Sequence, residues 1–279
     1  MEKDTSQQKH DIIFYIRRFH PERDKAPWLQ QFTVKVEKGM TILDGLHQIK
    51  ETQESTLAWR FSCRMGVCGS CAMLINGKPG LGCNTQIFDV TDHSVTLAPL
   101  PNFAIIKDLV PDLTPLFDKH THIQPQIKRI DAEELREPTG EYFQTPHELE
   151  QYLQFTYCIK CGCCMAACPT RATDLEYLGP VSLTQAYRYC KDSRDNGFKE
   201  RKKTVAIPHG VFSCHYAGEC SNVCPKGVDP ARAIQLMKRD LVLDYLKLKR
   251  RKKPAQVLSC SKRVEQKPKI LAPPFTVGM

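Results

Sequence analysis

Alternating apolar and polar residues mark the start of this 279-residue chain as strand-forming. Apolar side chains recur at every second position over residues 11–18 and again over 31–36, which places them on one face of each segment. The polar run PERDKAP between the two segments predicts a hairpin. Helical spacing follows Thr41, and a further strand leads into the turn pair Asn76-Gly77. We therefore expect a small domain of strands with one helix over residues 1–98.

Apolar residues at helical spacing dominate residues 141–250, which predicts a helical domain. Thr145–Glu148 has the capping-box pattern with proline in the first turn, and this predicts a helix N-terminus. Ser182 and Gln185 repeat the pattern before another expected helix, and Asp229-Pro230 is expected to start the longest one. An apolar stripe on that longest helix is interpreted as a packing face: Ile234, Met237, Leu241, Tyr245 and Leu248.

The remaining segments are interpreted as a connector and a tail. Residues 99–140 are rich in proline and are expected to wrap over the surface, with helical turns around Ile105–Val110. Residues 251–279 contain four prolines and no periodicity, so we expect an irregular tail there. No apolar run reaches the 18 residues that a membrane-spanning helix requires.

The positive charge is concentrated at the end of the chain. Between Tyr245 and Met279, one acid, Glu265, stands against ten basic residues, which account for the whole net charge of +9. The ten are Lys247, Lys249, Arg250, Arg251, Lys252, Lys253, Lys262, Arg263, Lys267 and Lys269. Two interpretations stay open: a solvated basic run after a helix, or contact with anionic lipid headgroups. The polar first ten residues predict no secretory signal, so a reduced cytoplasmic compartment is expected.

Eleven of the fourteen cysteines fall into three groups. The first, Cys63-x4-Cys68-x2-Cys71 with Cys83 beyond it, has the spacing of a plant-type 2Fe–2S site. Two bridged irons need four thiolates and a tight loop that aims backbone N–H groups at the sulfurs. Structural zinc would predict two Cys-x2-Cys pairs, and this group has one. Together with the strand order, the spacing predicts a β-grasp ferredoxin domain.

The second group is a bacterial ferredoxin run that ends in Cys168-Pro169. In such runs the fourth cysteine serves the other cluster, so the two halves exchange a ligand. The predicted ligands of a 4Fe–4S cluster are Cys158, Cys161, Cys164 and Cys224.

The third group lacks one cysteine, because Ala217 stands where the ferredoxin pattern requires a ligand. Cys168, Cys214 and Cys220 remain, and three thiolates predict a 3Fe–4S cluster. A 4Fe cluster with water or hydroxide on the fourth iron is the alternative. The cysteines outside the groups are interpreted as free thiols: Cys163, Cys190 and Cys260.

At this point the chain resembles one family over residues 11–250. The cysteine groups, with RFSCRMGVCGSCAM, IKDLVPDLTPLFDKH and CPKGVDPARAI, resemble the iron–sulfur subunit of succinate dehydrogenase and fumarate reductase. The resemblance implies an α+β chain: a β-grasp plant-type 2Fe–2S domain followed by an all-helical, bacterial-ferredoxin-like domain. It also implies single-electron relay from FAD in a flavoprotein subunit, through the three clusters, to quinone at membrane anchor subunits. Dicarboxylate chemistry then lies in the partner, so no catalytic residue is expected here.

The same resemblance implies a quinone pocket beside the third cluster. Pro169 and His215 match positions that border quinone and, where haem b is present, a haem propionate, and Lys238 matches a basic position nearby. Thr170 and Thr173 stand in the segment where ubiquinone-using members often carry tryptophan. Their presence favours menaquinone.

The predicted function is thus electron relay in a succinate:quinone oxidoreductase, peripheral on the cytoplasmic face of a prokaryotic cell membrane. Quinol:fumarate reductase uses the same relay in reverse and stays open as an alternative. A soluble fumarate reductase fed by thiols would carry further cysteine-rich modules, which the sequence lacks. A zinc-stabilised nucleic-acid-binding protein is the remote alternative, but the basic tail has no recognisable nucleic-acid-binding fold or interleaved aromatics.

Overall fold

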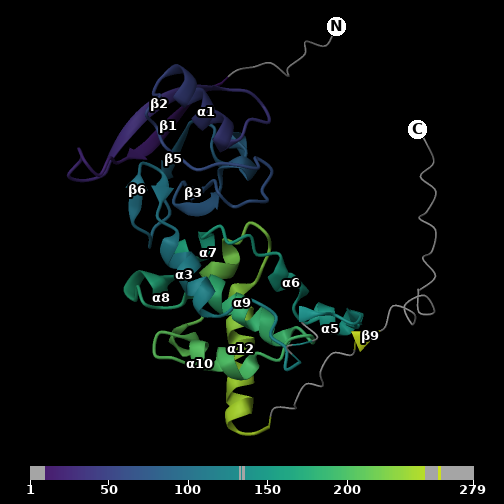
Figure 1. Ribbon diagram of the computed structural model, residues 1–279. Coiled ribbons are helices and arrows are strands. Elements are labelled where there is room, and N and C mark those ends of the chain that lie inside the picture. Colours follow the sequence, from purple (N-terminus) through teal and green to yellow (C-terminus); the bar gives the residue numbers. More distant parts are fainter. Residues whose placement is uncertain (1–9, 132, 134–135, 249–256, 259–279) are drawn as a thin grey trace, which may run out of the picture.

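A sheet-containing part at one end of the molecule adjoins a helical part at the other (Figure 1). The computed structural model describes residues 10–131, 133, 136–248 and 257–258. The predicted combination of a mixed sheet followed by helices is confirmed, and the β-grasp classification stays a prediction.

Five strands form the sheet, in the order β2-β1-β5-β3-β4. Their bounds are β1 His10–Arg18, β2 Trp28–Val36, β3 Ala72–Ile75, β4 Lys78–Leu81 and β5 Ser94–Ala98. Strands β1 and β5 run parallel, and the other neighbouring pairs are antiparallel. The alternate apolar residues of β1 and β2 are buried, as their spacing predicts.

Helix α1 (Ile42–Thr52) packs against this sheet and starts at the predicted residue. Thr41 caps it, since its hydroxyl accepts from the Asp44 N–H while the Asp44 carboxylate accepts from the Thr41 N–H. Two short helical segments, η2 (Gly82–Asn84) and α2 (Ile87–Val90), follow β4. The core of this part continues into the helical part through Cys161, Cys163 and Ala166.

The connector forms a strand pair where helical turns were predicted around residues 105–110, so that prediction is wrong. Strand β6 (Ile105–Lys107) pairs with β7 (Val110–Pro111), and α3 (Thr114–His122) follows. Asp108 sets the turn between the strands: it has a φ of +45°, and its buried carboxylate accepts from the backbone N–H groups of Phe19 and Ala58. Bonds to residues distant in sequence thus override the local pattern.

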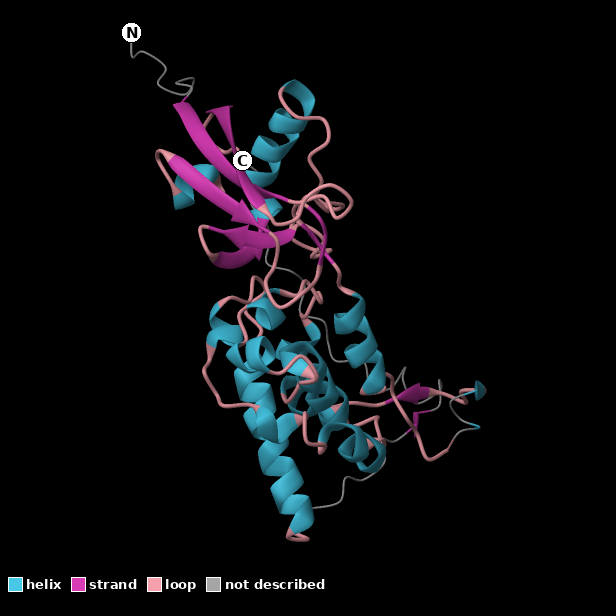
Figure 2. Ribbon diagram, turned by 90° about the vertical axis from the view of Figure 1, so that its left-hand side faces the viewer, coloured by secondary structure: helices cyan, strands magenta, loops and turns pink. Residues whose placement is uncertain are grey.

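The helical part is built around the packed pair α9 (Gly179–Lys191) and α12 (Pro230–Tyr245) (Figure 2). The other helices are α5 Pro146–Glu150, α6 Leu153–Thr156, α7 Cys163–Ala166, α8 Pro169–Thr173, α10 Phe198–Val205, η3 Val211–Ser213 and α11 Glu219–Asn222. A salt bridge of 2.8 Å between Lys191 and Asp240 joins α9 to α12.

Three local predictions in the helical part have different outcomes. The capping box at Thr145 and Glu148 is confirmed, with both reciprocal bonds present. The start predicted at Ser182 is wrong, because α9 begins at Gly179 with proline in its first turn and buries Ser182. Helix α12 starts at Pro230 as predicted.

The predicted packing stripe of α12 is only partly buried. Ile234, Met237 and Leu241 lie in the core, whereas Tyr245 is 80% exposed and Leu248 lies beyond the end of the helix. Two residues of the predicted irregular tail form a strand, β9 (Val257–Leu258), which pairs with β8 (Glu141–Tyr142). The rest of the tail lies outside the described residues. Within the part of the chain that is described, no helix has the length and apolar character to cross a bilayer.

Candidate metal centres

The first cysteine group lies on a loop whose backbone wraps around its sulfur atoms. Arg64, Gly66 and Gly69 all adopt positive φ angles, of 57°, 69° and 74°. These left-handed turns point successive N–H groups inward. The predicted combination of a tight loop and inward N–H groups is present.

Every sulfur of the first group accepts a backbone N–H. Cys63 Sγ accepts from the N–H groups of Val67 at 3.3 Å and Cys68 at 3.2 Å. Cys83 Sγ accepts from Gly66 at 3.3 Å, and Cys71 Sγ accepts from the Cys83 N–H at 3.4 Å. Such bonds stabilise negative charge on sulfur, which a cluster of thiolates requires.

Two thiols of this group have pKa values shifted in opposite directions. Backbone hydrogen bonds from Cys63 and Ser70 lower the pKa of Cys68 to about 6. Burial raises the pKa of Cys71 instead. The exposed thiol of Cys68 therefore ionises more readily than the buried thiol of Cys71.

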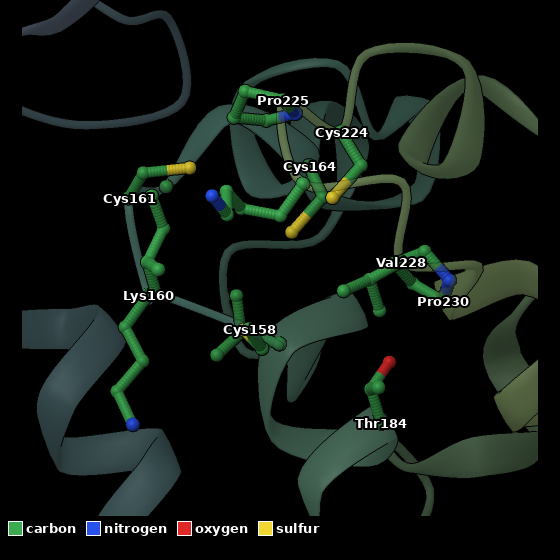
Figure 3. A pocket seen from close by; sticks show the side chains of 13 residues that line it. Cys158, Lys160, Cys161, Cys164, Thr184, Cys224, Pro225, Val228 and Pro230 are labelled. Carbon is green, nitrogen blue, oxygen red and sulfur yellow. The ribbon is translucent and has the colours of Figure 1, made fainter. Parts of the chain in front are cut away.

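The four predicted ligands of the 4Fe–4S cluster, called the second group from here on, gather around one hollow in the helical part. Four thiols line it, and they come from the loop before α7, from α7 itself and from the turn after α11 (Figure 3). They are Cys158, Cys161, Cys164 and Cys224. Burial raises the pKa values of three of these thiols, Cys158, Cys164 and Cys224.

The third group lines a second hollow. Cys168 precedes α8, Cys214 follows η3 and Cys220 lies in α11. Ala217 lines the same hollow, at the position of the missing ligand. The backbone N–H of Tyr216 donates to Cys214 Sγ at 3.4 Å, and the side-chain amide of Gln235 lies 4.0 Å from the same sulfur.

The second and third groups share one backbone conformation. Lys160 and Gly162 have φ angles of 54° and 89°, and Tyr216 and Gly218 have angles of 61° and 82°. In each case the glycine is the N-cap of a four-residue helix, α7 or α11. Ala217 therefore occupies the turn position that Cys161 occupies in the other half.

The thiols of the predicted 4Fe–4S and 3Fe–4S ligand sets are spread around their hollows. Among the described residues, no three His, Cys, Asp or Glu side chains converge closely enough to hold a single metal ion. Structural zinc requires four ligands within about 2.3 Å of one ion. Thiols arranged around a hollow fit a multinuclear cluster, whose sulfides fill the centre.

Comparison with known proteins gives the same assignment. A family model described as a 2Fe-2S iron-sulfur cluster binding domain matches residues 13–118, and one described as a 4Fe-4S dicluster domain matches residues 154–228. The fumarate reductase iron-sulfur subunit of Mycobacterium tuberculosis is 42% identical over 236 residues, which are 85% of this chain and 95% of the relative. The chain belongs to the family of succinate dehydrogenase and fumarate reductase iron–sulfur subunits. It is thus an electron-transfer subunit of an oxidoreductase complex, with a 2Fe–2S domain and a 4Fe–4S domain.

Two further relatives of this iron–sulfur subunit show the breadth of the family. The mitochondrial succinate dehydrogenase [ubiquinone] iron-sulfur subunit of Candida glabrata is 38% identical over 236 residues, with 83% of this chain and 91% of the relative covered. A chain of the solved Mycobacterium smegmatis Sdh1 complex in the apo form superposes with a TM-score of 0.73 at 26% identity. That superposition covers 85% of this chain and 98% of the solved chain.

The iron–sulfur subunit brings only some of the predicted quinone-pocket residues together. Pro169 and Thr170 line the second hollow. Thr173 is exposed, and its hydroxyl donates to the Thr170 carbonyl at 3.2 Å. His215 is exposed beside Cys214, and Lys238 Nζ donates to the Cys214 carbonyl at 2.7 Å.

Two of the predicted free thiols of the iron–sulfur subunit are described, and both are buried. Cys163 is adjacent to the second group, and a hydrogen bond with Cys161, together with burial, raises its pKa. Cys190 lies within α9. Cys260 lies outside the described residues.

The sequence did not reveal several residues that organise the centres. Asn102, in the connector, donates through its amide to the carbonyl groups of Met165 and Ala166, each at 3.0 Å. The hydroxyls of Tyr177 and Thr184 are buried beside the two hollows. A positive φ at a non-glycine residue has no clear sequence signal, although asparagine adopts it more readily than most, as Asn102 does at +65°.

Proposed function

We propose that this subunit relays single electrons between FAD in a flavoprotein subunit and a membrane quinone. Three clusters carry the electrons: 2Fe–2S on Cys63, Cys68, Cys71 and Cys83; 4Fe–4S on Cys158, Cys161, Cys164 and Cys224; and 3Fe–4S on Cys168, Cys214 and Cys220. The observation that carries the proposal is the grouping of thiols from distant segments around two neighbouring hollows, with Ala217 in place of one ligand.

The clusters supply the redox chemistry when bound, and the chain supplies everything around them. Its thiols hold iron, its backbone N–H groups stabilise negative charge on sulfur, and its apolar core excludes water. Burial raises the pKa values of Cys158, Cys164 and Cys224, because a thiolate is costly in a low-dielectric site.

Exposed apolar side chains beside the first and third cysteine groups support contacts with partner subunits. Met65 and Val67, in the first cysteine loop, are 73% and 56% exposed. Phe212 and Tyr216, beside the third group, are 53% and 61% exposed. Patches of this kind on a soluble surface are typical of interfaces. We assign the first loop to the flavoprotein, and the third group to the anchor subunits and quinone, on the cytoplasmic face of a prokaryotic membrane.

The proposed direction is succinate oxidation, with menaquinone as the acceptor because Thr170 and Thr173 stand where an aromatic donor is expected for ubiquinone. Haem b, where present, belongs to the anchor subunits. Quinol:fumarate reduction is the second candidate. It is favoured by the names of relatives at 41–42% identity, among them the fumarate reductase iron-sulfur subunit of Haemophilus influenzae.

The test is purification with the native partners, followed by assays of succinate–quinone and quinol–fumarate turnover with menaquinone and ubiquinone analogues. Faster succinate oxidation with a menaquinone analogue supports the proposal, and faster fumarate reduction supports the second candidate. Electron paramagnetic resonance of the oxidised complex tests the third cluster. Absence of a near-isotropic signal near the free-electron position overturns the 3Fe–4S assignment, and colourless protein with stoichiometric zinc overturns the relay.

A further inference from the structure

Each of the two hollows contains one buried hydroxyl that lacks a hydrogen-bond partner among the described residues. Tyr177 is fully buried and its phenol oxygen is unpartnered, and Thr184 is 1% exposed with its Oγ1 also unpartnered. Tyr177 lines the hollow of the third cysteine group, and Thr184 lines the hollow of the second. Buried hydroxyls in native proteins usually have a partner, and a cluster bound in the hollow would offer its sulfur atoms to each of these two.

The phenol of Tyr177 faces the three thiols of the third group. A phenol has an O–H donor as well as oxygen lone pairs, so the unpartnered hydroxyl of Tyr177 can donate to a sulfur in this hollow. Its backbone is fixed as well, since Lys119 Nζ donates to the Tyr177 carbonyl at 2.9 Å.

Thr184 lies on α9 and lines the hollow that contains Cys158, Cys161, Cys164 and Cys224. In Figure 3 its hydroxyl oxygen lies on the side of the residue that faces Val228, which lines the same hollow. A threonine hydroxyl within a helix commonly donates to the carbonyl four residues earlier. Thr184 makes no such bond, so its proton is free to bond a group in the hollow.

We propose that Tyr177 and Thr184 are positioning residues that donate hydrogen bonds to cluster sulfur and thereby raise the reduction potentials of the third and second clusters, respectively. Reduction adds one electron to a cluster that is already anionic, and a donor directed at sulfur stabilises the reduced form more than the oxidised form. The inference rests on the proposed function, because it takes the ligand sets from it.

The experiment uses the complex with its native partners and follows each cluster by redox titration with electron paramagnetic resonance. Tyr177→Phe removes only the phenol oxygen, and Thr184→Val replaces the hydroxyl with a methyl group. Loss of one charge-assisted hydrogen bond lowers the ratio of reduced to oxidised cluster about tenfold at fixed potential, which is about 59 mV for a one-electron couple.

The two variants control each other. Tyr177→Phe should lower the potential of the third cluster alone, and Thr184→Val that of the second cluster alone. Ser182→Ala is the matched control, because Ser182 is a fully buried, unpartnered hydroxyl on the same helix that lines neither hollow. It should leave both potentials unchanged. Thr184→Ser retains the hydroxyl and should retain the wild-type potential.

Unchanged potentials in both Tyr177→Phe and Thr184→Val overturn the inference, as does an equal shift in Ser182→Ala. If Tyr177→Phe does not assemble, the wild-type complex labelled with 3-fluorotyrosine replaces it in the titration. The more acidic phenol should raise the reduction potential of the third cluster. An unchanged potential would contradict the inference. A wild-type spectrum without the 3Fe signal overturns the proposed cluster type separately. The same titration on the resonance actually present then decides the role of Tyr177.

Discussion

Gly69 and Cys161 lie in direct contact, although they belong to different cysteine groups. A Cβ atom at residue 69 would stand 2.8 Å from the Cβ of Cys161 and 3.0 Å from its Cα. The backbone of the first cysteine loop therefore lies directly against a ligand of the proposed 4Fe–4S cluster. A side chain at residue 69 would prevent the two segments from lying this close together.

Gly69→Ala should slow electron transfer between the first and second clusters. Van der Waals contact begins at about 3.5 Å between carbon atoms, so the added methyl group forces the two loops apart by at least about half an ångström. Time-resolved reduction of the second cluster, and spin–spin coupling between the two clusters, would report the separation. Both clusters should still assemble.

Gly77→Ala is the control for Gly69→Ala. Gly77 has a φ of +79°, close to the +74° of Gly69, but an added Cβ would meet nothing within 4 Å. Both substitutions should lower the free energy of unfolding by about 1–2 kcal/mol, because a left-handed backbone is unfavourable for alanine. Equal electron-transfer rates in the two variants would contradict a role for the contact.

Ala217→Cys should convert the third cluster to the 4Fe–4S type with a lower potential and slow quinone reduction. The reason is the shared backbone conformation, which gives residue 217 the place that Cys161 has in the other half. Loss of the near-isotropic resonance in the oxidised complex would mark the conversion. His215→Cys adds a thiol at a neighbouring exposed position that does not line the hollow, so its spectrum should match that of the wild type.

Asp108→Ala should destabilise the first domain by about 3–5 kcal/mol, because the buried Arg18 guanidinium loses its close carboxylate partner and keeps the more distant carboxylate of Glu54, at 3.7 Å. Arg18 Nε lies 2.9 Å from Asp108 Oδ1, and both side chains are at least nine-tenths buried. The measurement is chemical denaturation of the intact protein followed by circular dichroism. Glu200→Ala removes a carboxylate that is 60% exposed and should cost under about 1 kcal/mol. Similar losses in the two variants would refute the prediction.

Asn102→Ala should lower the free energy of unfolding by about 1–3 kcal/mol, because the carbonyl groups of Met165 and Ala166 lose the side-chain amide that donates to both of them. The substitution should also expose the connector to limited proteolysis. Asn222→Ala is the matched control, since that amide is exposed and its bond to Glu219 is 3.4 Å long. A connector that resists protease equally in both variants would show that Asn102 does not hold it.

The sequence predicts best where the controlling interactions are local. Alternation predicted the strands β1 and β2, while helical spacing after Thr41 and the capping box at Thr145 predicted two helix starts. Cysteine spacing predicted groups of thiols that the structure gathers around two hollows. In each case residues a few positions apart carry the information, so a single sequence reveals it.

Distant contacts account for what the sequence did not predict. The turn at Asp108 depends on Arg18 and Ala58, which lie 90 and 50 residues away in the chain. The close approach of Gly69 to Cys161 and the hydroxyls in the hollows also depend on tertiary packing. The early start of α9 is different, because Pro180 is itself a local signal for a helix start near Gly179.

With the proposed ligands, each half of the helical domain supplies one cysteine to the cluster of the other half. Cys168 completes the third cluster from within the second run, and Cys224 completes the second cluster from within the third. Neither hollow is finished until both runs have met. A substitution that prevents the two runs from meeting should therefore disable both clusters together.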